Sequence, residues 1–279
     1  MSESGPSTIA CQRRAPADAA DIWADTWADT WADAPASAPR PARFRRPVIA
    51  DDGSDVLVGA AGGSGGALLG FAGLANRLMA PLEWVDAFCA AQNHSAIYLR
   101  DPEMTLFQGG VPSLVPDLGG GLEALRDRSH RLETRRVICR CTSGGGFGAI
   151  RYGLGLGAAH VLCASPPTGL LAAERVGDPR AKLLVQRMEA QFGRDALDLA
   201  QDFGASAGAT QRTIWFGADA RENAAHARHV EGLPGVSLVP VPGYAGHMSF
   251  EKVLETGAFD AFVSGGWRAA AAGPPLRSP

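Results

Sequence analysis

A serine surrounded by small residues is the feature of this sequence that most directly indicates chemistry. An apolar run from Val137 to Cys141 leads to Ser143, and glycines occupy the three positions after it. A serine held in a sharp turn between a strand and a helix needs neighbours of little bulk two residues before and two after it. Gly145 meets this requirement, and Cys141 stands where glycine is usual. The pattern predicts a nucleophile elbow, although such a turn also suits a serine that only caps the next helix.

Two backbone amides are candidates for stabilising the negative charge that forms when a serine attacks a carbonyl. The first is the N–H of Gly144, which follows the serine at the start of the expected helix. The second is the N–H of Leu74, in the turn after an apolar run that ends at Phe71, where Gly73 permits close approach. We therefore expect an oxyanion hole formed by Leu74 and Gly144.

A base and an acid are expected later in the chain, in the order serine, acid, histidine. Of six histidines, His247 alone lies between the last expected strand and the last expected helix, which predicts that it is the base. Asp219, in the turn after the strand expected at 213–216, is the predicted acid, with Glu222 as the alternative. Either carboxylate could instead serve only the N-terminus of the helix that begins there.

Apolar runs and helical spacings alternate along the chain. Strands are expected at 55–60, 67–71, 95–99, 136–139, 160–164, 213–216 and 236–241, and helices at 81–91, 122–132, from the serine turn to about 156, at 222–230 and at 249–255. This alternation predicts an α/β fold: a mostly parallel, twisted sheet with helices on both faces. The functional site of such a sheet lies at the carboxyl ends of its strands.

These residues together resemble the α/β-hydrolase superfamily over about 67–255. The turn from Phe71 to Leu74, the segment from Tyr98 to Pro102 and the sequence Ser165-Pro166-Pro167-Thr168 are similar to those of small bacterial hydrolase-like proteins, some of which accompany polysaccharide or natural-product assembly. The resemblance implies an α/β-hydrolase fold and a Ser-His-Asp triad.

The chain is expected to divide into a tail and one folded domain. Residues 1–46 are rich in Ala, Pro, Ser, Asp and Arg, so they bury too little apolar surface to fold alone and are predicted to be disordered. The α/β-hydrolase domain is expected at 47–268, with a lid-like insertion at 165–210 that would set substrate choice. Residues 269–279 are expected to be a flexible C-terminus.

A tandem tryptophan repeat lies within the tail. Trp23, Trp27 and Trp31 recur every four residues, so a short helix would carry them on one face. Such a stripe predicts association with a protein partner, a second copy or this domain itself. The alternative is a tandem duplication that the tail tolerates.

Composition excludes several classes of function. The 279 residues carry a formal charge of −3, without the clustered basic residues of a nucleic-acid binder. Apolar stretches are shorter than a membrane span, and Met1 to Ala10 do not form a signal peptide. Five cysteines at irregular spacing predict free thiols in a reducing cytoplasm and no structural metal.

The predicted function is a serine hydrolase that cleaves a small-molecule ester or thioester through an acyl-enzyme on Ser143, without a metal or organic cofactor. An acyltransferase would use the same residues with an alcohol or amine as acceptor. A non-catalytic accessory protein with this fold is the alternative from another class, favoured if Ser143 and His247 lie apart.

Overall fold

The computed structural model describes residues 45–62, 65–171, 179–205, 210–247 and 249–269. The chain separates into two units, Met1–Ala34 and Pro35–Pro279, and all described residues belong to the second. The tryptophan repeat, most of the expected tail and the last ten residues therefore lie outside the described residues.

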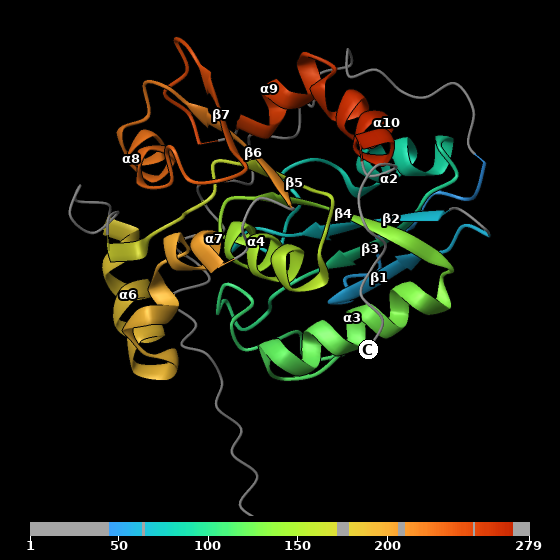
Figure 1. The fold of residues 1–279 in the computed structure, drawn as a ribbon, viewed down its shortest axis with the longest axis horizontal. Helices are drawn as coiled ribbons and strands as arrows, with labels where there is room; N and C mark the ends of the chain where they lie inside the picture. The colour runs from blue at the N-terminus through green and yellow to red at the C-terminus, as the bar shows by residue number, and fades with distance from the viewer. Residues whose placement is uncertain (1–44, 63–64, 172–178, 206–209, 248, 270–279) are drawn as a thin grey trace, which may run out of the picture. The chain divides into compact units, whose positions relative to one another are not determined.

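The described residues form a seven-stranded sheet (Figure 1). Its strands are β1 (Val56–Gly59), β2 (Gly65–Phe71), β3 (Ser95–Leu99), β4 (Thr134–Thr142), β5 (His160–Ala164), β6 (Gln211–Gly217) and β7 (Val236–Val241). They are ordered β1-β3-β2-β4-β5-β6-β7, and every neighbouring pair is parallel except β1 with β3. The predicted α/β class and mostly parallel sheet are confirmed. Strand β2 begins at Gly65, two residues before the expected start at 67, and β1 pairs with β3.

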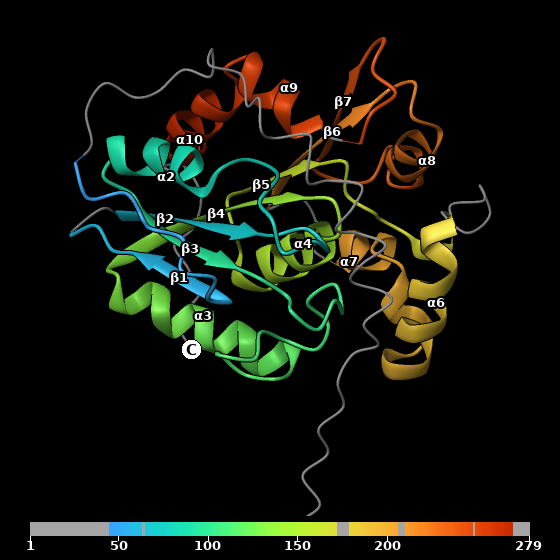
Figure 2. The same cartoon turned by 180° about the vertical axis from the view of Figure 1, so that it is seen from behind.

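Helices pack on both faces of this sheet (Figures 1 and 2). They are α2 (Leu82–Ala91), α3 (Leu118–Arg131), α4 (Gly145–Leu156), α6 (Pro179–Phe192), the 3₁₀ helix η1 (Arg194–Leu197), α7 (Ala200–Ala205), α8 (Arg221–His229), α9 (Ser249–Glu255) and α10 (Ala258–Ala269). Helices α3 and α4 lie on one face, and α2, α9 and α10 on the other. None of the described helices is long and apolar enough to cross a membrane.

Strand β4 shows how the two-residue period of a strand divides the core. Val137, Cys139 and Cys141 pack in the cluster with α3 and α4, whereas Ile138 packs in the cluster with α2, α9 and α10. Arg140 lies on the same side as Ile138 and is fully buried, with its guanidinium 3.9 Å from the centre of the Phe250 ring. Burial lowers the pKa of Arg140 to about 10, so the group stays charged at neutral pH. A cation–π contact, together with apolar packing, therefore holds strand β4 against helix α9.

A buried ion pair fastens the start of the domain to helix α2. Arg46 is one residue before the expected domain boundary, yet its side chain is 4% exposed and that of Asp86 is 0% exposed. Arg46 Nη2 and Nη1 donate to Asp86 Oδ1 and Oδ2 over 2.7 and 2.9 Å. The Tyr98 hydroxyl and the Ile49 N–H also donate to this carboxylate, over 3.1 and 2.8 Å. Four donors satisfy the buried charge, which is the condition for such a pair to be stable.

We predict that Asp86→Ala lowers the free energy of unfolding by about 3–5 kcal/mol, because it leaves the Arg46 guanidinium buried without its counter-charge. Urea denaturation of the purified protein measures the change. Asp51→Ala is the matched control: Asp51 also pairs with an arginine, Arg100, over 2.6 Å, but its side chain is 39% exposed. The control should cost less than about 1 kcal/mol. Equal losses in the two variants would contradict the prediction.

Candidate active site

Ser143 lies in a strained turn between β4 and α4, at the carboxyl end of the sheet. Its φ is +47°, a left-handed conformation that residues other than glycine rarely adopt. Its N–H donates to the Ala164 carbonyl at the end of β5 over 2.9 Å, and its carbonyl accepts from the Gly146 N–H over 2.9 Å. Hydrogen bonds to strand β5 and within helix α4 thus hold the turn and maintain its strained backbone.

The glycines after Ser143 are required by the backbone that surrounds them. A Cβ atom at position 145 would lie 2.6 Å from the Phe71 carbonyl oxygen and 2.5 Å from that of Ala72. At position 146 it would lie 2.4 Å from Pro166 Cβ. Helix α4 therefore approaches the ends of β2 and β5 more closely than any side chain would allow. This close approach fixes where the serine stands.

Cys141 occupies the other position that needed a small side chain. It is 1% exposed and is the register partner of Cys163 on β5. The Cys141 side chain packs in the core cluster on the α4 face of the sheet and behaves as a small apolar group. Its departure from glycine is therefore accommodated within the core.

His247 comes from the loop between β7 and α9, and its Nε2 lies 2.7 Å from Ser143 Oγ. This loop passes over the end of β6, where a Cβ atom at position 217 would lie 2.5 Å from the Tyr244 carbonyl oxygen and 2.8 Å from that of Gly246. Glycine at 217 lets the loop come close to the sheet. The structure thus brings together the serine and the histidine that the sequence predicted.

The far end of the histidine loop is held by two serines. Ser249 Oγ donates to the Trp215 carbonyl on β6 over 3.2 Å and lies 2.8 Å from Ser165 Oγ. Because the single hydroxyl proton of Ser249 is used on Trp215, Ser165 is the donor in the serine–serine bond. Ser165 itself has a φ of +48° and follows β5 directly. The ends of β5 and β6 therefore anchor the chain two residues beyond His247.

The partner of His247 Nδ1 differs from the expectation. Asn223, buried in the first turn of α8, places Oδ1 3.0 Å from Nδ1, and its Nδ2 donates to the Gly246 carbonyl over 3.2 Å. Asp219 lies in the turn before α8 with an exposed side chain, and its N–H donates to the Tyr244 carbonyl on the loop over 3.2 Å. Glu222 is half-exposed, beside Asn223. Helix α8 thus places Asn223, which the sequence did not predict, at hydrogen-bond distance from His247 Nδ1.

The turn after β2 lies against the serine, as an oxyanion hole requires. A Cβ atom at position 73 would lie 3.4 Å from Ser143 Cβ, and one at position 144 would lie 2.6 Å from Leu74 Cγ. Within the described part of the chain, neither the Leu74 nor the Gly144 N–H donates to a protein acceptor. Both residues therefore lie close to the serine.

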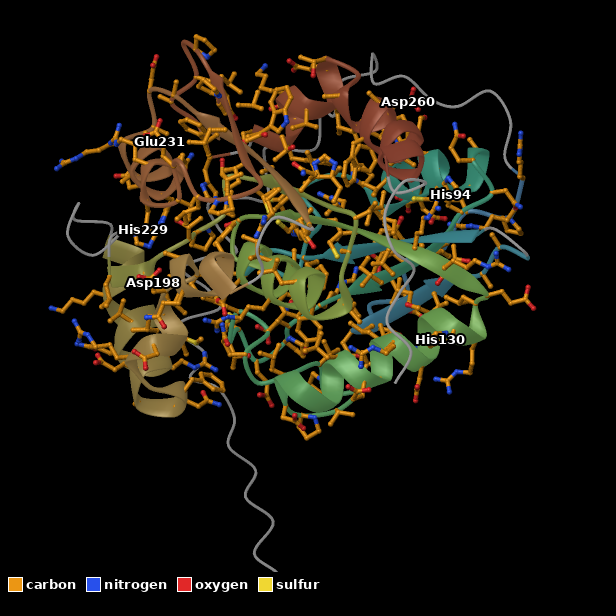
Figure 3. All side chains as sticks on the ribbon, viewed as in Figure 1. His94, His130, Asp198, His229, Glu231 and Asp260 are labelled. Atoms are coloured by element: carbon orange, nitrogen blue, oxygen red, sulfur yellow. The ribbon has the colours of Figure 1, made fainter. Side chains whose placement is uncertain are left out.

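Three other histidines make structural contacts. His229 Nε2 lies 2.7 Å from Asp198 Oδ1, joining α8 to the segment between β5 and β6 (Figure 3). His226 Nδ1 accepts from the Thr168 N–H over 3.2 Å. Burial lowers the pKa of His160, which contacts Thr213, to about 4, so it is neutral at physiological pH. Among the described residues, no group of three or more His, Cys, Asp or Glu side chains is placed to hold a metal ion.

Solved structures of several enzymes resemble this chain. The capsule O-acetyltransferase of Neisseria meningitidis serogroup A matches with a TM-score of 0.55 at 14% identity, covering 78% of this chain and 94% of that one. A hormone-sensitive lipase from a metagenome library matches with a TM-score of 0.53 at 16% identity, covering 83% and 87%. Thermogutta terrifontis esterase 2, phosphonylated by sarin, matches with a TM-score of 0.52 at 14% identity, covering 81% and 97%.

No protein-family model and no curated protein sequence matches this chain. At these identities the structural matches establish the fold alone. Together with the strand order, the strained serine after β4 and the histidine after β7, they show that the chain has the α/β-hydrolase fold.

Proposed function

We propose that this protein is a serine hydrolase that cleaves a small-molecule ester or thioester. The observation that carries the proposal is the 2.7 Å contact between Ser143 Oγ and His247 Nε2, made by a serine in a strained turn at the carboxyl end of the sheet. Two groups from distant parts of the chain are held at hydrogen-bond distance in the orientation of a nucleophile and its base. This geometry also counts against the non-catalytic alternative, which would be favoured by a separated pair.

In the proposed reaction, Ser143 Oγ attacks the carbonyl carbon while its proton passes to His247 Nε2. The carbonyl oxygen becomes an oxyanion, which accepts hydrogen bonds from the Leu74 and Gly144 amides. The tetrahedral intermediate collapses as the imidazolium returns the proton to the leaving alcohol or thiol. Water, deprotonated by His247, then cleaves the acyl-enzyme and regenerates the serine.

Acyl transfer is the second candidate, favoured by the structural likeness to a capsule O-acetyltransferase. Only the last step differs, because an alcohol or amine replaces water as the acceptor. The residues that activate either acceptor are the same, so the site geometry suits both reactions.

Residues 165–210, which we propose contribute to substrate choice, contain helices α6 and α7 between β5 and β6. Protein association through the tryptophan repeat and a cytoplasmic location stay predictions.

We predict that a fluorophosphonate probe labels the wild-type protein once, on Ser143, and that Ser143→Ala abolishes the labelling. The phosphonyl group is attacked by an activated serine in the manner of an acyl carbonyl. Intact-mass spectrometry measures the adduct. Ser237→Ala, which removes an exposed serine on β7, is the control and should be labelled like wild type. Labelling of Ser143→Ala at the wild-type rate would exclude Ser143 as the nucleophile.

His247→Ala should lower kcat on a p-nitrophenyl ester by a factor of about 10³ or more, because the serine loses its base. The measurement is steady-state hydrolysis, followed by the absorbance of the released p-nitrophenolate. Adding a primary alcohol to the wild-type reaction distinguishes the two candidate functions: an ester product accumulating faster than free acid favours acyl transfer. A His247→Ala variant with unchanged kcat would remove the histidine from the mechanism.

The close approach of the histidine loop to β6 gives another prediction. Gly217→Ala should lower kcat by about 10²-fold, since the added methyl group pushes the Tyr244 and Gly246 carbonyls, and with them the base, away from the serine. Gly62→Ala is the matched control, because a Cβ atom there has nothing within 4 Å. Thermal melting of both variants shows whether the fold is retained. Wild-type kcat in Gly217→Ala would show that the loop tolerates the displacement.

A further inference from the structure

We propose that Asn223 is the positioning residue for His247, and that the site is built for an amide rather than a carboxylate at this position. The inference rests on the proposed function, because it concerns how the base of that reaction is oriented. It replaces the acid expected at Asp219 or Glu222 with a neutral group.

The hydrogen-bond partners of Asn223 determine which way its amide points. The Gly246 carbonyl can only accept, so the group facing it at 3.2 Å must be the amide nitrogen, Nδ2. Oδ1 therefore faces His247 Nδ1 at 3.0 Å. An amide oxygen can only accept, so Nδ1 must carry the ring proton.

This protonation state is the one that the reaction requires. With the proton on Nδ1, the lone pair of the neutral imidazole is on Nε2, which lies 2.7 Å from Ser143 Oγ. Nε2 can then accept the serine proton. Asn223 is 5% exposed, so little water competes for these hydrogen bonds. The buried amide thus selects the productive tautomer and holds the plane of the ring.

The Gly246 carbonyl also explains why an amide stands here. An aspartate at 223 would keep an oxygen opposite Nδ1 but would place its second oxygen about as close to the Gly246 carbonyl oxygen as Nδ2 is now, at 3.2 Å. Two acceptors at that distance repel each other, and the carboxylate would be buried with one oxygen unpaired. The loop that carries the base therefore provides an acceptor that suits only an amide donor.

Two substitutions at Asn223 distinguish its role in orienting His247 from the effect of a charge beside the ring. Asn223→Leu keeps the side-chain size but removes both hydrogen bonds, so kcat should fall by a factor on the order of 10² with KM changed little. Asn223→Asp should also reduce kcat at pH 7, and it should move the acid limb of the kcat/KM profile to higher pH, because a carboxylate beside Nδ1 stabilises the imidazolium. Asp219→Asn and Glu222→Gln are matched controls and should stay within about twofold of wild type.

The pH comparison is made between variants, so the other charges near the loop stay constant. The charged and titratable groups on the elements packed around the loop are Asp219 in the turn before α8, Arg221 and Glu222 in the first turn of α8, Glu251 and Lys252 on α9, and Tyr244 on the loop itself. Lys252 Nζ lies 5.7 Å from the centre of the Tyr244 ring. A shift seen in Asn223→Asp and absent from both controls reports on position 223.

A readout independent of turnover tests the tautomer. In protein containing ¹⁵N-histidine, the ring nitrogen signals of His247, assigned with His247→Gln, should show the proton on Nδ1 in wild type. In Asn223→Leu they should show a mixture of tautomers. Wild-type kcat in Asn223→Leu, a proton on Nε2 in wild type, or a larger loss in Asp219→Asn would each overturn the inference. Failure of wild type to react with fluorophosphonate would instead overturn the proposed function.

Discussion

The contact between Ser143 and His247 joins residues that are 104 positions apart, and it exists only where several strand ends coincide. Strand β4 delivers the serine, while the ends of β5 and β6 hold the turn and the far end of the histidine loop through Ala164 and Trp215. Parallel strands place their carboxyl ends at one edge, so each of these supports acts at the same place. A shift of one of these strands along its neighbours would therefore separate Ser143 from His247.

Close backbone packing sets the distances between the segments that meet at this edge of the sheet. Position 145 allows no Cβ because the Phe71 and Ala72 carbonyls lie there, and position 217 allows none because the histidine loop lies there. Because glycine has no Cβ atom, the end of β2, helix α4 and the histidine loop can all come close to the serine. The left-handed backbone of Ser143 is a consequence, since the turn must reverse direction in the space that remains. Such strain persists only on a rigid support, which the buried core beneath it supplies.

The sequence was sufficient for the fold and for the expectation that Ser143 and His247 lie together, but it did not point to Asn223. Strands at 95–99, 160–164 and 236–241 were predicted with their observed bounds because apolar runs between turn residues define them. The buried arginine obscured the length of β4, and α10 has no clear start signal. The orienting residue was sought among carboxylates, whereas the one that we propose is an amide. Its signal was a polar residue on the buried stripe of α8, shared with Ala227 and Val230.

A neutral orienting group changes how the site must handle charge. A carboxylate beside the histidine would stabilise the imidazolium that forms when the serine proton is transferred, whereas the Asn223 amide contributes only a dipole. In the proposed reaction, the transition state would then depend more on stabilisation of its negative end by the Leu74 and Gly144 amides. Both amides belong to the crowded segments around the serine, so the rigidity that places the nucleophile also preorganises the donors. The same close packing of backbone at the sheet edge therefore supports both halves of the proposed chemistry, the proton transfer and the oxyanion.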